Sequence, residues 1–286
     1  MKSGKLTMPM LVCLAAVVCL AGSVWAAEGA ACKGAGCCKS CEHKGNLTKE
    51  EAEKYAQTER QTIYSYTSLV DGTPDNRLIA IGARFGYETF RNDQQPHFSV
   101  GPELKVSYKD FAIRTHATER IGDGSSYNDA AIGWQQRWVT ESGNMPTLST
   151  LLEVGYSRGT HHTKDINVDI KIMGIAAKNI WRGTAYANVW GTVANESYIH
   201  NERRFQPGMM LGYKWRTCEQ FSLIGAYGLK AARSKDTHVI NTLELAAEYR
   251  PTSYFSVGPG IVIGLDGGEE TPTFGAGITS TFRFGF

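Results

Sequence analysis

The last fourteen residues of the chain, 273–286, alternate between two kinds of side chain, and this constrains the fold more than any other feature. One set of alternate positions is apolar apart from one serine: Phe274, Ala276, Ile278, Ser280, Phe282, Phe284 and Phe286. The other set is small or polar: Gly275, Gly277, Thr279, Thr281, Arg283 and Gly285. Because successive strand residues point to opposite faces, the segment predicts a strand with one apolar face. A strand of about 10 residues with this alternation is typical of a transmembrane barrel.

The same alternation recurs along the chain from residue 77 onward. Predicted strands lie near residues 78–89, 98–108, 110–119, 127–139, 147–158, 165–178, 182–194, 205–215, 219–231, 238–249, 253–264 and 271–286. Short connections, such as 109–110 and 250–253, alternate with longer polar ones, such as 91–97, 121–126 and 195–204. The pattern predicts an all-β fold, a transmembrane antiparallel up-and-down barrel of about twelve strands over residues 77–286. A soluble barrel would instead place its apolar face inside.

The start of the chain predicts export. Residues 1–26 have a basic beginning with Lys2 and Lys5, an apolar run, and a small-residue cleavage site ending at Ala26, as a signal peptide does. No later stretch approaches the 18 or so apolar residues of a transmembrane helix. We therefore expect an exported protein of the cell outer membrane. A lipoprotein signal is the alternative, but Cys13 and Cys19 each follow a valine rather than a small residue.

Residues 27–47 form a cysteine-rich tail that we expect in the periplasm. Its candidate metal ligands are Cys32, Cys37, Cys38, Cys41 and His43, and the Cys38-x-x-Cys41 pair has ligand spacing. Two disulfides are the preferred interpretation, because an exported chain meets an oxidising compartment. Capture of zinc or cuprous copper, which suit thiolates, and cross-linking to a partner remain open. No other cofactor is expected.

Residues 48–76 connect this tail to the barrel. Thr48 and Glu51 form a capping box, so the sequence predicts a short helix there. Residues 62–76 contain the turn pairs Asp71-Gly72 and Pro74-Asp75 and are expected to be a linker, with an added strand as the alternative.

Charged side chains gather on the opposite parity from the apolar ones, and they are too costly to place in lipid. Those expected to line the lumen are Arg84, Glu88, Glu103, Lys105, Arg114, His116, Arg137, Glu153, Asp169, Lys171, Glu244 and Glu248. They form either a polar pathway for small solutes or a set of ion pairs that fills a narrow lumen. Without the leader, 28 basic residues balance 28 acidic ones, which gives no basis for nucleic-acid binding.

Enzymatic activity is not expected. His97 and Ser99 have the His-x-Ser spacing of outer-membrane lipid hydrolases. Phe98, however, belongs to the apolar parity, which turns His97 and Ser99 toward the lumen and away from a lipid substrate.

The C-terminal aromatic strand resembles the last strand of bacterial outer-membrane barrels, in which a final phenylalanine is an assembly signal. That resemblance implies this role for Phe282, Phe284 and Phe286, with the barrel-assembly machinery and outer-membrane lipids as partners. The hairpin LELAAEYRPTSYFSVGPGIVIG and the ending GAGITSTFRF are similar to the outer-membrane transporter family associated with the MetA pathway of phenol degradation. This resemblance implies about twelve strands and passage of small, hydrophobic or aromatic compounds. The rival function is a structural or metal-handling envelope protein whose barrel anchors the cysteine-rich tail.

Overall fold

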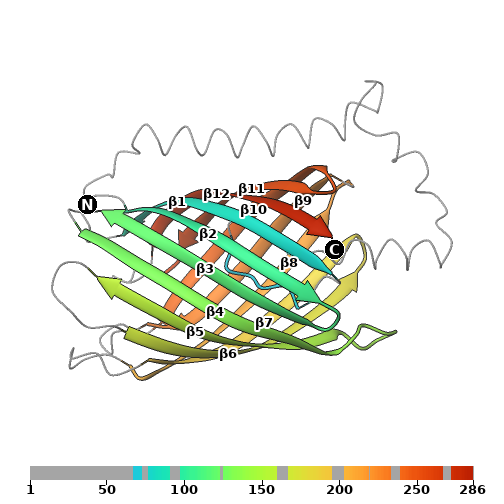
Figure 1. Ribbon diagram of the computed structural model, residues 1–286, viewed down its shortest axis with the longest axis horizontal. Helices are drawn as coiled ribbons and strands as arrows, with labels where there is room; N and C mark the ends of the chain where they lie inside the picture. Colours follow the sequence, from blue (N-terminus) through green and yellow to red (C-terminus); the bar gives the residue numbers. More distant parts are fainter. Residues whose placement is uncertain are drawn as a thin grey trace. The chain divides into compact units, whose positions relative to one another are not determined.

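The computed structural model describes residues 67–72, 77–90, 97–122, 125–159, 167–194, 203–218, 220–232, 239–266 and 272–285. Within them, twelve strands form one closed antiparallel barrel (Figure 1). They are β1 (Leu78–Phe90), β2 (His97–Tyr108), β3 (Phe111–Gly122), β4 (Ser125–Val139), β5 (Thr147–Gly159), β6 (Asn167–Ile180), β7 (Gly183–Ala194), β8 (Phe205–Arg216), β9 (Phe221–Ala231), β10 (Val239–Thr252), β11 (Phe255–Gly264) and β12 (Pro272–Gly285). The prediction of a barrel of about twelve strands is confirmed.

The barrel closes where its last strand pairs with its first. β12 runs antiparallel to β1 from the pair Leu78↔Gly285 to the pair Phe90↔Pro272, and every other strand pairs with its neighbours in sequence. Closure gives each strand two partners and so removes the exposed sheet edges on which other chains could pair.

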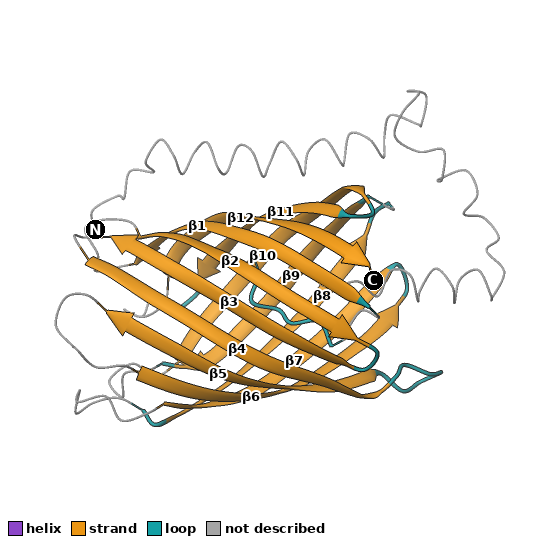
Figure 2. Cartoon of the chain, in the orientation of Figure 1, coloured by secondary structure: helices purple, strands orange, loops and turns teal. Residues whose placement is uncertain are grey.

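Tight turns collect at one end of the barrel, drawn in teal in Figure 2. Residues 109–110, 181–182 and 253–254 each join two strands directly, and 140–146 form a slightly longer hairpin. Lys109 and Trp181 have φ angles of 54° and 53° at the first position of their turns, as some tight hairpins require. One predicted loop is wrong, because 121–126 largely continues the β3–β4 ladder through Ile121↔Ser126. Pairing uses backbone groups, so polar side chains did not end these strands.

Large apolar side chains cover the outside of the barrel. Examples are Phe85, Phe98, Ile132, Leu152, Ile172, Val189, Leu211, Leu245 and Phe282, of which Ile172 is 61% exposed. Aromatic side chains at the end with the tight turns are also exposed, including Trp138 and Trp181. An apolar band of this extent with aromatic residues at its rim is suited to a lipid bilayer rather than to water. Among the described residues, no helix has the length and apolarity to cross a membrane.

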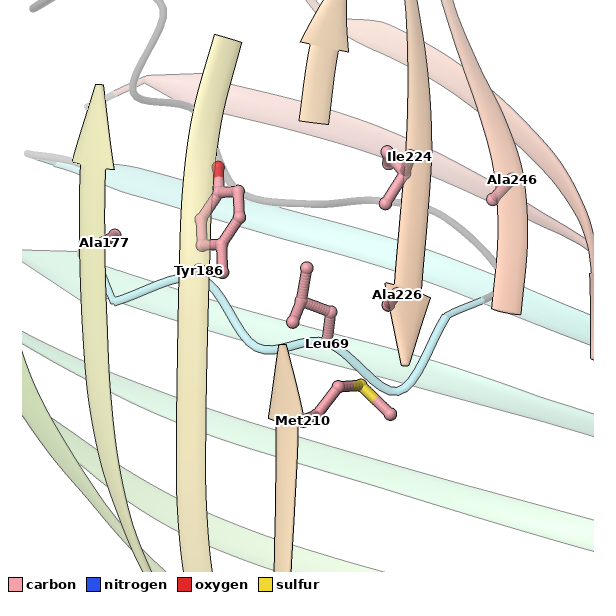
Figure 3. Close-up of a cluster of buried hydrophobic side chains, with 7 residues drawn as sticks. All are labelled: Leu69, Ala177, Tyr186, Met210, Ile224, Ala226 and Ala246. Atoms are coloured by element: carbon pink, nitrogen blue, oxygen red, sulfur yellow. The ribbon is translucent and has the colours of Figure 1, made fainter. Parts of the chain in front are cut away.

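A short extended segment, residues 67–72, lies inside the barrel and is called the inner strap below. Figure 3 shows it beside the strands of the wall, with Leu69 pointing between Tyr186 and Ile224. The sequence predicted a linker here, and its pattern gave no sign of an interior position. The expected signal peptide, cysteine-rich tail and short helix lie outside the described residues, so these remain predictions.

Candidate functional site in the barrel lumen

The lumen beside the inner strap is filled on one side by apolar side chains. Leu69 packs in a cluster from β6 to β10 that comprises Ala177, Tyr186, Met210, Ile224, Ala226 and Ala246. Val70 packs with Leu151, Met173 and Ile175 from β5 and β6. Trp190 of β7 contacts both clusters. These contacts leave Leu69 only 4% exposed, so this side of the lumen is packed like a protein core.

A buried charge network closes the packed side. Glu248 of β10, whose side chain is fully buried, accepts a 2.8 Å hydrogen bond from Nζ of Lys214 on β8. Arg250 Nε donates to the other oxygen of the same carboxylate. Asp71 of the inner strap is buried as well and interacts electrostatically with Lys214. Two cations therefore face two carboxylates, one of which the strap supplies.

The inner strap is held near its beginning by Glu244 of β10. The carboxylate of Glu244 is 3% exposed and accepts hydrogen bonds from the backbone N–H of Ser68 at 2.6 Å and from its hydroxyl at 2.9 Å. Nη2 of Arg84 on β1 donates to the carbonyl of Thr67 at 3.2 Å. Two strands on this part of the wall thus bind the same end of the strap.

The rest of the strap binds three further wall strands through its backbone. Asn188 of β7 accepts from the N–H of Val70 at 2.8 Å and donates to its carbonyl at 3.0 Å, as a neighbouring strand would. Gln135 of β4 donates to the carbonyl of Asp71 at 2.7 Å. Ser149 of β5 donates to the carbonyl of Gly72 at 2.7 Å. Since leaving a buried polar group without its partner costs about 1–3 kcal/mol, these bonds fix the strap firmly.

Close packing also fixes the position of the strap. A Cβ atom on Gly212 of β8 would lie 2.8 Å from Cδ2 of Leu69, and one on Gly72 would lie 2.7 Å from Oγ of Ser149. The small residue at 212 therefore gives Leu69 its room, and the small residue at 72 lets the strap approach β5.

The other side of the lumen holds a cavity of about 410 Å³. Its walls are the strap from Thr67 to Val70 and residues of β1 to β6 and β12. The charged and titratable lining residues are Arg84, Glu103, Lys105, Arg114, His116, Asp129, Glu153 and Lys171. Uncharged lining residues include Thr115, Thr118 and Thr281. The cavity is thus polar, in contrast to the packed side.

Two ion pairs span neighbouring strands in the cavity wall. Nε of Arg84 lies 3.5 Å from Glu103, and Nζ of Lys171 lies 3.3 Å from Glu153. Both pairs are partly exposed, so water screens them more than it screens the Lys214–Glu248 pair. Arg114, between them on β3, makes no hydrogen bond or ion-pair contact within the described part of the chain. Arg114 interacts electrostatically with Glu153 and His116 across the cavity wall.

The twelve predicted lumen residues lie in different surroundings. Seven line the cavity: Arg84, Glu103, Lys105, Arg114, His116, Glu153 and Lys171. Glu244 binds the strap, and Glu248 belongs to the buried network. Glu88 and Asp169 are half-buried on the inward parity but outside the cavity lining. Arg137 lies at the rim with the tight turns, where its guanidinium is 2.5 Å from Asp110.

Sequence reasoning missed two of the residues that hold the strap. Asn188 and Ser149 are buried polar residues with inward parity, but they carry no charge, so the search for costly lipid-facing charges did not find them. Asn188 also lies in a strand that carries apolar residues on both faces. Apolar residues on the inward face of β7 were the sequence signal for a segment inside the barrel, because these residues contact the strap.

The other sequence-predicted sites are placed as follows. Phe98 is exposed, while His97 and Ser99 alternate with it on the less exposed parity. No group of three or more potential metal ligands occurs among the described residues, and the cysteine cluster lies outside them. Cys218 carries a free thiol in the connection between β8 and β9. Phe282 and Phe284 are exposed, and Phe282 packs against Phe255 with ring centroids 4.8 Å apart. Phe286 is not described.

Solved structures with similar folds are bacterial barrels. The NanC porin aligns with a TM-score of 0.53 and 7% identity, covering 71% of this chain and 100% of that one. The KdgM porin in complex with disordered oligogalacturonate aligns with a TM-score of 0.45 and 8% identity, covering 72% of this chain and 99% of that one. Outer membrane phospholipase A from Escherichia coli aligns with a TM-score of 0.43 and 8% identity, covering 79% and 95%. At these identities the likeness shows the fold alone. No family model matches the sequence, and the search of curated proteins found no match.

Proposed function

We propose that this protein is an outer-membrane channel through which small polar solutes pass without chemical change. The observation that carries the proposal is the cavity of about 410 Å³ beside the inner strap, lined by charged side chains from β1 to β6. A wall of charged and hydroxyl groups can replace part of a solute's hydration shell, which is how channels admit polar solutes. Passage needs no catalytic group, and none is assigned.

The lining favours polar solutes over the hydrophobic or aromatic compounds that the resemblance to the phenol-pathway family implies. The apolar groups that could bind an aromatic ring, including Tyr186, Trp190 and Met210, lie in the packed side of the lumen. An aromatic solute in the cavity would face mainly ions and hydroxyl groups, which lose hydration in its presence.

Placement in the outer membrane is part of the proposal. It is supported by the apolar exterior, by the signal peptide predicted from residues 1–26, and by the barrel fold. The end with the tight turns is assigned to the periplasm, because outer-membrane barrels have their short turns there.

The test is to reconstitute the full mature chain in planar bilayers and in liposomes. We expect discrete single-channel conductance in KCl, and swelling of the liposomes with monosaccharides. Uptake of a neutral aromatic compound such as phenol must be measured against protein-free liposomes, because phenol crosses lipid unaided. A folded barrel that is electrically silent and passes no sugar would overturn the proposal.

One observation favours a second function, in which the barrel is an anchor. The packed clusters and the Lys214–Glu248–Arg250 network fill much of the lumen, as expected where conduction is not required. The cysteine-rich segment would then carry the function, either through disulfides or by binding zinc or copper. A silent barrel whose tail binds zinc stoichiometrically after reduction would support this alternative.

A further inference from the structure

The inner strap is held by polar side chains that reach it from several strands of the barrel wall. Four buried polar side chains from four strands use their hydrogen-bonding groups on it: Gln135, Ser149, Asn188 and Glu244. Three of them bind backbone atoms only, and Glu244 binds both the backbone and the hydroxyl of Ser68. Such bonds recognise an extended chain rather than a passing solute, so these four side chains are occupied by the strap.

The strap divides the lumen into two unlike parts. Leu69 and Val70 pack in apolar clusters of the wall, and all four residues from Thr67 to Val70 border the polar cavity. The residues that bind it come from β1 and β10 at its beginning and from β4 and β5 at its end, so it bridges walls formed by distant strands. One side of the lumen is therefore packed with apolar side chains, and the other side holds the cavity.

From this placement we propose that the inner strap is a fixed partition that sets the size limit of the channel. This rests on the proposed function. A barrel of twelve strands is wider than a small eight-stranded barrel filled by side chains, so it needs additional material to form a narrow passage. The strap and the side chains packed on it supply that material. Solutes pass only between the strap and β1 to β6, and the solute-facing surface of the strap is formed by Thr67 to Val70.

The position of the strap outside the ladder makes the proposal testable without disturbing the barrel. The double variant Leu69→Asp/Asn188→Ala places a charge in the apolar cluster and removes both hydrogen bonds to Val70, and it leaves every strand pairing unchanged. Leu69→Met is the matched control, since it keeps an apolar side chain of similar volume at the same place. Resistance of each barrel to unfolding in SDS shows that it has assembled.

We expect the double variant to conduct roughly two-fold or more above the wild-type protein, because ion flow rises with the open cross-section. It should also admit di- and trisaccharides that the wild-type protein and Leu69→Met exclude. A second variant, Gly212→Val, pushes Leu69 and the strap away from β8 toward the cavity, and should lower the conductance and the size limit. Gly155→Ala, at an inward position where the nearest atom to an added Cβ is 3.8 Å away, should not.

The outcomes separate this inference from the proposed function. If the wild-type protein conducts and the double variant has the same conductance and size limit, the partition is overturned while the channel stands. If the wild-type protein is silent and the double variant conducts, the strap is a complete plug rather than a partition, and this inference is wrong. If both folded barrels are silent, the channel and the partition are overturned together.

Discussion

Individual charged residues of the lumen differ mainly in how much water surrounds them. Glu248 is fully buried between Lys214 and Arg250, whereas the pairs Arg84–Glu103 and Lys171–Glu153 border the cavity. A buried charge that loses its partner has no solvent to compensate it, while a partly exposed one is rehydrated. The same chemical change should therefore have very different effects at the two places.

Replacing Glu248 by glutamine should strongly destabilise the barrel. The amide leaves Lys214 and Arg250 without the carboxylate that both contact, and loss of one partner of a buried pair costs about 3–5 kcal/mol. Glu153→Gln is the matched control, since it breaks a pair at the cavity, and should cost about 1 kcal/mol or less. Urea unfolding in lipid vesicles measures both. Equal losses of unfolding free energy for the two variants would show that burial of the Lys214–Glu248 pair does not raise the cost of breaking it.

Reversing the charge of Arg114 should change the ion selectivity of the channel. Arg114 lines the cavity, so Arg114→Glu replaces a positive charge by a negative one beside the solute path. We expect the ratio of cation to anion permeability to rise by roughly three- to ten-fold, or about 0.7–1.4 kcal/mol. The reversal potential in a KCl gradient gives this ratio.

Arg137→Glu is the control for that experiment. Arg137 lies at the rim beside Asp110, where salt screens its charge, and its reversal should shift the ratio less. A larger shift from Arg137 than from Arg114 would place the selective region at the rim rather than in the cavity.

At the scale of the strand, the two faces follow different rules. The outward parity meets lipid, and its side chains need only be apolar, whereas the inward parity meets the strap, the network or the cavity. Depth along the strand matters as well, since aromatic residues such as Trp181 at the turns lie in the interfacial zone.

A lysine on the lipid face should be costly in the middle of a strand and tolerated at its end. Ile172 is an exposed outward residue within β6, and Ile172→Lys should destabilise the barrel by about 2–4 kcal/mol. Trp181→Lys, in the turn after the same strand, should cost about 0–1 kcal/mol for the charge itself. Reversible unfolding in vesicles compares them. If both cost the same, β6 does not cross the bilayer at the depth assigned here.

The closing strand is expected to carry the assembly signal. β12 pairs with β1 along its whole length, so insertion requires this strand to be delivered to the seam. Deletion of Phe286 should leave the chain in the periplasm and sensitive to added protease. The amount of membrane-inserted barrel should fall by about ten-fold or more, and a ten-fold change corresponds to about 1.4 kcal/mol. Normal insertion of the truncated chain would count against the terminal aromatic residue as the signal.

For the whole molecule, the oxidation state of the cysteines before the barrel can be tested directly. If Cys32, Cys37, Cys38 and Cys41 form two disulfides, the non-reduced protein will show only the thiol of Cys218 among these five cysteines. Thiol titration under denaturing conditions, before and after reduction, measures this, and Cys218→Ser removes the background. Thiols that are free at isolation and become protected on adding zinc would establish the metal site instead, because zinc binds thiolates.

The sequence by itself determined the barrel, its strand boundaries to within a few residues, and the inward parity of its charged residues. It could do so because the bilayer imposes a single requirement on every strand, apolar residues on alternate positions, and each strand records that requirement locally. The twelve segments from β1 to β12 were therefore visible one at a time.

Only the tertiary structure decided what occupies the lumen. The residues that bind the inner strap, such as Asn188 and Glu244, are 118 and 176 positions away from their partners in the strap, and no local period records such a contact. The short turn pair Asp71-Gly72 has the composition of a linker, and the barrel interior is what gives it hydrogen-bond partners. The division into a packed side and an open cavity follows from that one placement, because a lumen can be filled by any segment that satisfies its buried polar groups.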